Sequence, residues 1–93
     1  MKILVADAFP RERLTELESL GLPIDHRPDL PAKDLAAAAR DAAVLIVRSK
    51  QVGADVFEEA QALSLVVRAG AGVNTIDVAA ASRRGVYVAN CPG

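Results

Sequence analysis

The chain has 93 residues, of which 52% are hydrophobic and 25% are charged, and its formal net charge is −1. This composition is typical of a folded globular domain and differs from that of a disordered chain. A near-neutral balance with 3% aromatic residues argues against a nucleic-acid surface, and the charge balance also argues against an anionic membrane. A single cysteine, Cys91, excludes an internal disulfide and a cysteine-rich metal site.

The apolar segments are short. None approaches the roughly 20 residues that a membrane-spanning helix needs. The N-terminal segment lacks the small-residue cleavage site of a secretory signal, so it is expected to form a strand. These features predict a soluble cytoplasmic protein that is short for a complete two-substrate enzyme.

Apolar runs alternate along the chain with segments of helical pattern. Strands are predicted over residues 2–6, 22–26, 43–47, 64–67 and 86–89, with helices between them over 10–20, 31–41, 54–63 and about 75–84. Gly21 and Gly85 follow the first and last of these helices, where a left-handed residue commonly ends a helix. Pro23 weakens the second strand and places it at a sheet edge.

Several residues suit the expected helix starts. Pro10 fits the first position of the first helix, because its missing N–H would have no partner there. Asp29 is expected to cap the second helix, and Asn74 or Thr75 the fourth. Asp77 would then lie in the first turn of the fourth helix, near the positive end of its dipole.

Five strands alternating with four helices predict an α/β fold with one parallel sheet and right-handed crossovers. A weak edge strand and an apolar first strand favour the flavodoxin-like three-layer architecture with strand order 2-1-3-4-5, as a single domain over residues 1–93. That fold normally ends in a fifth helix, which has no counterpart in this sequence. We therefore expect part of one sheet face to be bare.

In an open parallel sheet, ligands bind beyond the carboxyl ends of the strands, near the point where the strand order reverses. Three strand ends carry suggestive residues, at positions 7–9, 48–50 and 68–74. The predicted order places the third strand between the first and the fourth. The three ends are therefore expected to share one rim.

The turn after the fourth strand contains Gly70 and Gly72, which let the backbone approach a ligand closely. It is expected to lead into a helix N-terminus, whose N–H groups and dipole favour an anion. The main-chain N–H groups of Ala71, Gly72 and Val73 are thus candidates for holding a carboxylate or a phosphate. The alternative of a tight turn without a ligand stays open, because a lone Gly-x-Gly is a weak motif.

The turn does not carry the fingerprint of a dinucleotide site. Thr75 stands where the third glycine is required, and Asn90 stands near the position of the acid that binds the ribose. A Walker A lysine is absent from the sequence as well. The chain is therefore expected to bind neither NAD nor ATP by itself.

Arg48 follows the third strand directly. Its guanidinium is suited to hold a carboxylate or phosphate with two hydrogen bonds, with the Ser49 hydroxyl as a further donor. A solvated arginine at a strand end is the alternative. Asp7 ends the first strand, as in the acidic pocket of response regulators, but Val47 and Arg48 occupy the place of the phosphoacceptor aspartate, so that interpretation fails.

Four motifs occur together in one register that covers nearly the whole chain: residues 45–49 (LIVRS), 68–77 (RAGAGVNTID), 80–86 (AASRRGV) and 90–93 (NCPG). In combination they resemble the D-2-hydroxyacid dehydrogenases. The resemblance implies the N-terminal part of a flavodoxin-like substrate domain. It also implies that the NAD-binding Rossmann domain and the catalytic Arg, Glu and His lie outside these residues, so the chain alone would be inactive.

Within the family, the resemblance is strongest to the oxidoreductases of serine biosynthesis that act on 3-phosphoglycerate with NAD. It implies that Arg48 and Ser49 face the phosphate of 3-phosphoglycerate or a related 2-hydroxyacid. The N–H groups of Ala71, Gly72 and Val73 would hold the substrate carboxylate. It implies no catalytic, cofactor-binding or metal-binding residue in this chain.

Two other hypotheses stay open. The chain could be an autonomous flavodoxin-like scaffold without ligand function, or a binder of small anions. In either case an exposed apolar sheet face tends to pair with another copy, which predicts a homodimer.

Overall fold

The computed structural model describes residues 2–7, 11–21, 23–69 and 75–90. Its strands are β1 (Ile3–Val5), β2 (Ile24–His26), β3 (Val44–Val47), β4 (Leu65–Arg68) and β5 (Tyr87–Asn90). Its helices are α1 (Arg11–Glu18), the 3₁₀ turn η1 (Ala32–Asp34), α2 (Leu35–Ala38), α3 (Ala54–Glu59) and α4 (Val78–Arg83). The elements alternate along the described residues in the predicted order.

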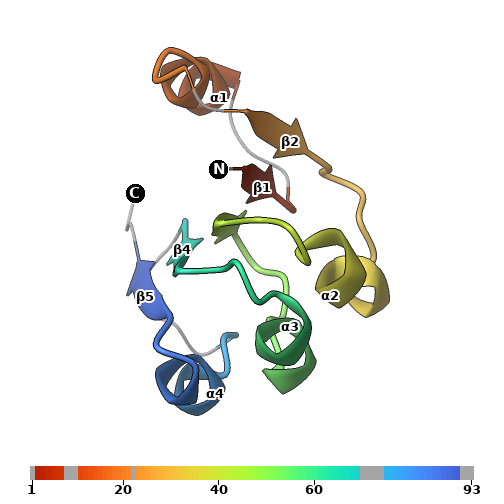
Figure 1. The fold of residues 1–93 in the computed structure, drawn as a ribbon. Coiled ribbons are helices and arrows are strands. Elements are labelled where there is room, and N and C mark those ends of the chain that lie inside the picture. Colours follow the sequence, from red (N-terminus) through yellow and green to blue (C-terminus); the bar gives the residue numbers. More distant parts are fainter. Residues whose placement is uncertain (1, 8–10, 22, 70–74, 91–93) are drawn as a thin grey trace.

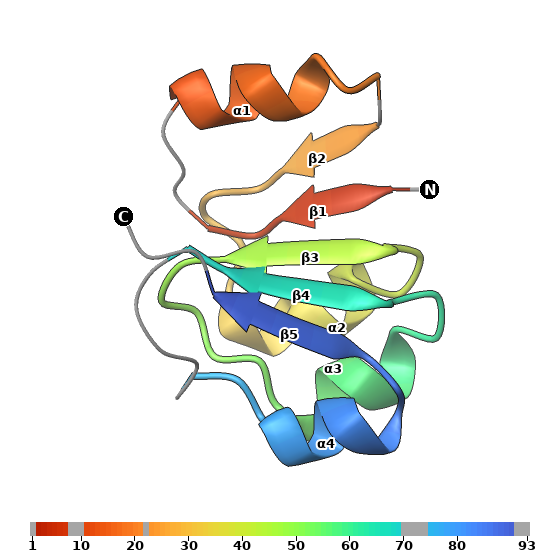
Figure 2. The same ribbon diagram turned by 90° about the vertical axis from the view of Figure 1, so that its left-hand side faces the viewer.

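The strands form one parallel sheet in the order β2-β1-β3-β4-β5, which confirms the predicted flavodoxin-like topology (Figure 1). Leu45 in the central strand β3 pairs with Leu4 of β1 on one side and with Val66 of β4 on the other. β2 lies at an edge, as the proline before it predicted. The strands all point the same way, so their carboxyl ends gather at one rim of the sheet (Figure 2).

One face of the sheet carries the main core. Helices α2, α3 and α4 lie over this face (Figure 1), and Phe57 of α3 is 1% exposed beneath them. Alternate residues of the central strands point into this layer, as the two-residue period of a strand requires. The strand side chains buried here are Leu4, Leu45, Val47 and Val66.

The opposite face has a smaller core. Of the described helices, α1 lies on this side, near β2 and β1 (Figures 1 and 2). Ile3, Val5 and Ile46 are buried, with partly buried apolar side chains of α1, β2, β3 and β4 around them. Toward β5 the cover thins, and Tyr87 is 79% exposed. Among the described residues this face is therefore partly bare at β5, and its link to a missing fifth helix stays a prediction.

The second predicted helix is shorter than expected. Instead of a helix over residues 31–41, the chain forms η1 and then the single turn of α2. Asp29 does not cap it, because Pro31 is the residue before η1 and no side-chain cap bond is made. The chain turns after Ala39 so that Ala42 can be buried before β3 begins. Packing here overrides the high helix propensity of the alanine run.

The start of α4 also differs from the prediction. Asp77 is the capping residue, and its Oδ1 accepts a hydrogen bond from the Ala80 backbone N–H at 3.0 Å. Thr75 therefore does not cap the helix, and Asn74 lies outside the described residues. The reason is that Ile76 pairs with Val52 in an isolated parallel bridge, which keeps the chain extended up to the cap.

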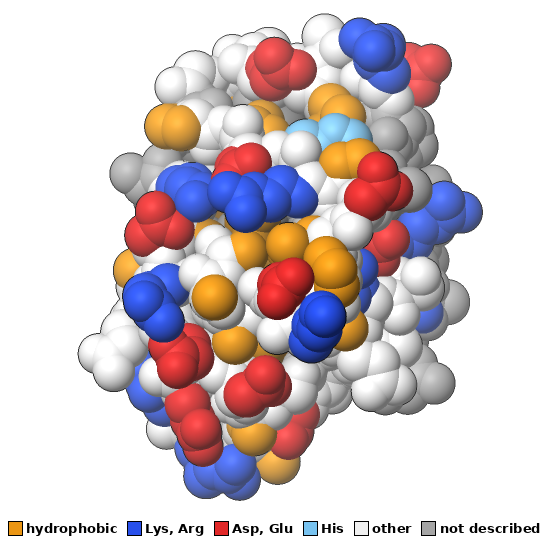
Figure 3. Space-filling model, turned by 90° about the vertical axis from the view of Figure 1, so that its right-hand side faces the viewer, with side chains coloured by type: hydrophobic (Ala, Val, Ile, Leu, Met, Phe, Trp, Pro, Cys, Tyr) orange, Lys and Arg blue, Asp and Glu red, His pale blue; other side chains and the backbone are white. Residues whose placement is uncertain are grey.

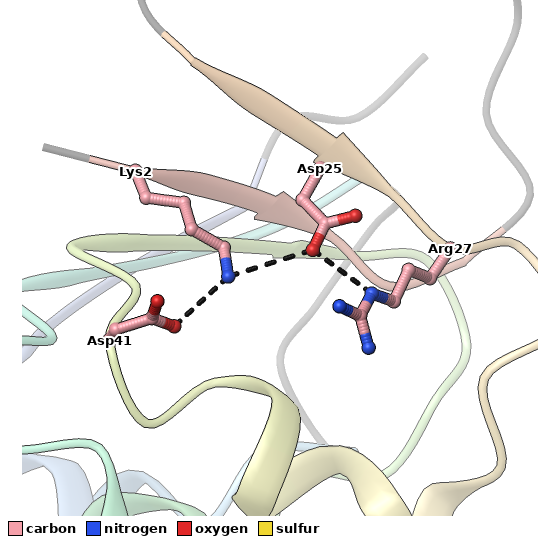
Figure 4. Close-up of polar contacts among 4 residues, drawn as sticks. All are labelled: Lys2, Asp25, Arg27 and Asp41. Atoms are coloured by element: carbon pink, nitrogen blue, oxygen red, sulfur yellow. Dashed lines mark hydrogen bonds and ion pairs between the residues drawn. The ribbon is translucent and has the colours of Figure 1, made fainter.

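Charged side chains of both signs are mixed on the face of the molecule that Figure 3 shows. Near the edge strand β2, the Lys2 ammonium lies 2.9 Å from the Asp41 carboxylate and 3.5 Å from the Asp25 carboxylate (Figure 4). The Arg27 guanidinium lies 2.9 Å from the same Asp25 carboxylate. The hydrogen bond from Arg27 lowers the pKa of Asp25, helped by the charges of Arg27 and Lys2. The hydrogen bond from Lys2 likewise lowers the pKa of Asp41.

No helix within the described residues is both long and apolar enough to span a membrane.

Candidate functional site

A side chain from β1 organises the rim. Asp7 follows β1, and its Oδ2 accepts hydrogen bonds from three consecutive backbone N–H groups in the turn after β3. The donors are those of Arg48, Ser49 and Lys50, at 3.0, 2.9 and 3.0 Å. Consecutive N–H groups that converge in this way form an anion-binding nest. Here the anion is the protein's own carboxylate.

The other side of Asp7 contacts β2. A ring nitrogen of His26, Nε2, lies 3.1 Å from the Asp7 backbone carbonyl oxygen. The next residue, Arg27, donates its backbone N–H to Val5 at 2.8 Å. The end of β1 is therefore held between the edge strand and the turn after β3, which fixes where the Asp7 carboxylate lies.

The turn after β3 presents the two predicted side-chain ligands. Arg48 and Ser49 are both exposed, and they are the first two residues after β3. The Lys50 ammonium is partly buried and donates to the Leu30 carbonyl at 2.5 Å. The Arg48 and Ser49 side chains thus face solvent at the rim, while the backbone of their turn is held by Asp7.

The glycine turn is fixed to the same place at both of its ends. Before it, the Ala69 N–H donates to the Val47 carbonyl at 2.8 Å. After it, the Thr75 carbonyl accepts from the Val52 N–H at 2.9 Å, and the Asp77 N–H donates back to Val52 at 2.8 Å. The turn is therefore tied on both sides to β3 and to the segment that follows it, within a few residues of Arg48.

Ala71, Gly72 and Val73, the predicted backbone donors, lie outside the described residues. One argument for them is corrected by the structure. The glycine turn does not lead directly into a helix N-terminus, because residues 75–77 intervene, and the Asp77 carboxylate already occupies the start of α4. The helix N-terminus that this argument invoked therefore starts later than predicted, and the backbone donors themselves stay a prediction.

The same geometry bears on a dinucleotide. A Rossmann site places the pyrophosphate on the N-terminus of the helix that follows the glycine turn directly. In this chain the start of α4 lies several residues later and is closed by Asp77. The start of α4 therefore differs from the helix start that such a site uses.

Sequence reasoning assigned no role to Asp7, which the structure places at the centre of the rim. The sequence did contain a signal for this role, because Asp7 ends a strand that the predicted order places beside β3.

Arg68, the last residue of β4, is half-buried at the same rim and pairs in register with Val47. Within the described residues, no cluster of His, Cys, Asp or Glu is suited to hold a metal ion.

The sequence matches, over residues 3–93, the family described as D-isomer specific 2-hydroxyacid dehydrogenase, catalytic domain. The chain therefore belongs to the D-isomer specific 2-hydroxyacid dehydrogenase family, which confirms the resemblance found in its motifs.

Curated relatives are D-3-phosphoglycerate dehydrogenases. That of Methanocaldococcus jannaschii is 40% identical over 93 residues, which cover 99% of this chain and 18% of that protein. That of Rattus norvegicus is 40% identical over 92 residues, covering 98% and 17%. The chain spans less than a fifth of the length of these relatives.

Solved structures share the fold. The 3-phosphoglycerate dehydrogenase of Entamoeba histolytica, determined with NAD⁺ bound, superposes with a TM-score of 0.85 at 27% identity, over 97% of this chain and 32% of that chain. A protein of Pyrococcus horikoshii superposes with a TM-score of 0.90 at 26% identity, over 99% and 28%. These matches confirm the fold class.

Proposed function

We propose that this chain is the first part of the substrate-binding domain of an NAD-dependent 2-hydroxyacid dehydrogenase, and that its substrate is 3-phosphoglycerate. The support is the family membership, together with relatives that carry the name D-3-phosphoglycerate dehydrogenase. In the whole protein the chain would bind and orient the substrate. Its place would be cytoplasmic, in serine biosynthesis.

The observation that carries the proposal is that the described residues on either side of positions 70–74 are hydrogen-bonded next to Arg48 and Ser49. Ala69 before these positions bonds to Val47, and Thr75 and Asp77 after them bond to Val52. A ligand with two anionic ends needs two such recognition elements, held at a fixed distance. A guanidinium that can donate two hydrogen bonds suits a phosphate, and backbone N–H groups suit a carboxylate.

The roles follow from these chemistries. Arg48 would hold the substrate phosphate with its guanidinium fork, and the Ser49 hydroxyl would donate one further hydrogen bond. The N–H groups of Ala71, Gly72 and Val73 would hold the carboxylate beside the carbon that exchanges hydride. Because the family resemblance implies that the catalytic residues and the NAD-binding domain lie outside these residues, the 93 residues alone would bind without turnover.

A second candidate function is self-association. It is favoured by the bare part of the sheet face, where Tyr87 is 79% exposed and Leu65 is partly buried. Apolar surface of this kind favours pairing, here as a homodimer. This function is compatible with the first, because the bare face and the rim are different surfaces.

The test is a two-dimensional NMR titration of the chain with 3-phosphoglycerate. We expect saturable amide shifts at residues 48–50 and 70–74. Glycerate, which lacks the phosphate, should shift residues 70–74 with little effect near Arg48, whereas inorganic phosphate should act mainly near Arg48. Well-dispersed peaks that none of the three ligands moves would contradict the proposal.

A further inference from the structure

The turn that carries Arg48 has its backbone donors already in use. Oδ2 of Asp7 accepts from the N–H groups of residues 48–50, all within 3.0 Å. A carboxylate that accepts several hydrogen bonds from the backbone is a strong, charge-assisted anchor. The nest therefore holds an internal anion and has no N–H group left for an external one.

We infer that Asp7 is a positioning residue for anion recognition at the rim: it fixes the turn after β3 so that the Arg48 and Ser49 side chains, rather than the turn backbone, meet the ligand. This inference rests on the proposed function. It deepens that function, because it assigns recognition of the anion beside β3 to side chains and not to the backbone of the turn.

The surroundings of Asp7 support a positioning role. Asp7 lies between β2 and β3, because His26 contacts its carbonyl while its carboxylate reaches across to the turn. The Asp7 carboxylate also holds the backbone of residues 48–50 together, while the Lys50 side chain extends away from this turn to the Leu30 carbonyl. A residue that joins β1, β2 and the turn after β3 sets the direction in which Arg48 leaves the sheet.

Removal of the carboxylate should therefore have two separable effects. In Asp7→Ala the three N–H groups lose their acceptor, so their amide protons should move upfield and exchange faster with solvent. The freed nest should then bind a small anion such as acetate. Arg48 would lose its fixed direction, and because its two-pronged contact depends on geometry, the affinity for 3-phosphoglycerate should fall by roughly tenfold, which corresponds to about 1.4 kcal/mol.

Asp7→Asn keeps the shape and leaves a neutral carbonyl acceptor, so it should retain the turn and lose less affinity. Asp25→Asn is the control, because it makes the same change at an aspartate that pairs with two cationic side chains on the edge strand and does not contact the turn after β3 in any hydrogen bond described above. We expect this control to lower stability without changing the affinity for the ligand.

The experiment is an amide NMR spectrum of each variant without ligand, followed by titration with 3-phosphoglycerate. We expect weaker binding in the order native chain, Asp7→Asn, Asp7→Ala, with acetate restoring the amide positions of residues 48–50 and part of the affinity in Asp7→Ala. If Asp7→Ala does not fold, Asp7→Asn carries the test alone. Equal affinities in the native chain and the folded Asp7 variants would overturn the inference.

The two proposals fail in different ways. If the native chain binds no 3-phosphoglycerate, the proposed function is wrong, and the role of Asp7 is then judged from the ligand-free amide positions and exchange rates. Unchanged amides at residues 48–50 in the Asp7 variants would show that the carboxylate does not hold the turn, and the inference would be wrong whatever the ligand does.

Discussion

The two faces of the sheet differ in how completely they are buried. On the face under α2, α3 and α4, Leu4, Leu45 and Val66 are 0% exposed. On the other face, burial is complete near β1 and declines toward β5, where Tyr87 stands in solvent. The comparison teaches that most of the packing free energy lies in one layer. The second face has apolar surface to offer a partner.

The largest expected effect comes from the centre of the well-covered face. Replacing Phe57 by Ala should cost about 3–5 kcal/mol in the free energy of unfolding, because it leaves a cavity beneath α3. Val67→Ala, on the thinly covered face, should cost about 1 kcal/mol, since its side chain is only partly buried. Urea unfolding monitored by circular dichroism measures both. A loss in unfolding free energy at Val67 as large as that at Phe57 would contradict the claim that most of the packing free energy lies in the well-covered layer.

A smaller effect on the free energy of unfolding is expected at the start of α4, one of the helices of this well-covered layer. Asp77→Ala removes the carboxylate that caps α4, which should cost about 1 kcal/mol, because the Ala80 N–H loses its acceptor. Asp77→Asn keeps an acceptor and should recover most of the loss. The thermal unfolding midpoints of the two variants test this. An Asn variant as unstable as the Ala variant would contradict the capping role.

Acidic pH should lower the free energy of unfolding through two carboxylates near the edge strand β2. The pKa values of Asp25 and Asp41 are lower in the folded chain than their ordinary value of 3.8, so the unfolded chain binds more protons near that pH. Their contribution is present above about pH 4 and is lost as the pH falls through the folded-state values. Lys2→Met should flatten this decline of unfolding free energy with acid, whereas Lys33→Met should leave its slope unchanged.

The smallest effect on stability is expected at Tyr87. Tyr87→Asp should change the free energy of unfolding by no more than about 0.5 kcal/mol, because the side chain is exposed. It should nevertheless weaken self-association, since it places a charge on the bare face. Sedimentation velocity over a range of concentrations measures the association. A native chain that stays monomeric throughout would contradict the proposed homodimer.

The sequence predicted the topology well because its signals are local and agree with one another. The apolar run of β3 marks a strand with both neighbours in place, and Pro23 marks an edge. Gly21 and Gly85 do adopt the left-handed conformation, with φ of +77° and +71°. At these positions a residue other than glycine would be strained, so the sequence identified the helix ends directly.

The errors arose where contacts distant in sequence decide the structure. The Val52–Ile76 bridge delays the start of α4, and nothing in the local pattern indicates that pairing. Asp7 was placed on the rim, but its role as the acceptor that holds the turn after β3 was missed, since its hydrogen-bond donors lie about forty residues further along the chain. The position of Arg48 after β3 was predicted correctly because a strand end is a local feature, while its role as a ligand stays a prediction.

The central claim is that the rim at the carboxyl ends of the strands binds 3-phosphoglycerate, and it can be tested directly. The measurement is a crystal structure of the chain with saturating 3-phosphoglycerate. We predict that the phosphate lies within hydrogen-bond distance of the Arg48 guanidinium, that the carboxylate lies at the backbone N–H groups of residues 71–73, and that Asp7 still holds the turn after β3. A ligand bound away from the rim, or a phosphate seated on the turn backbone in place of Asp7, would contradict this account.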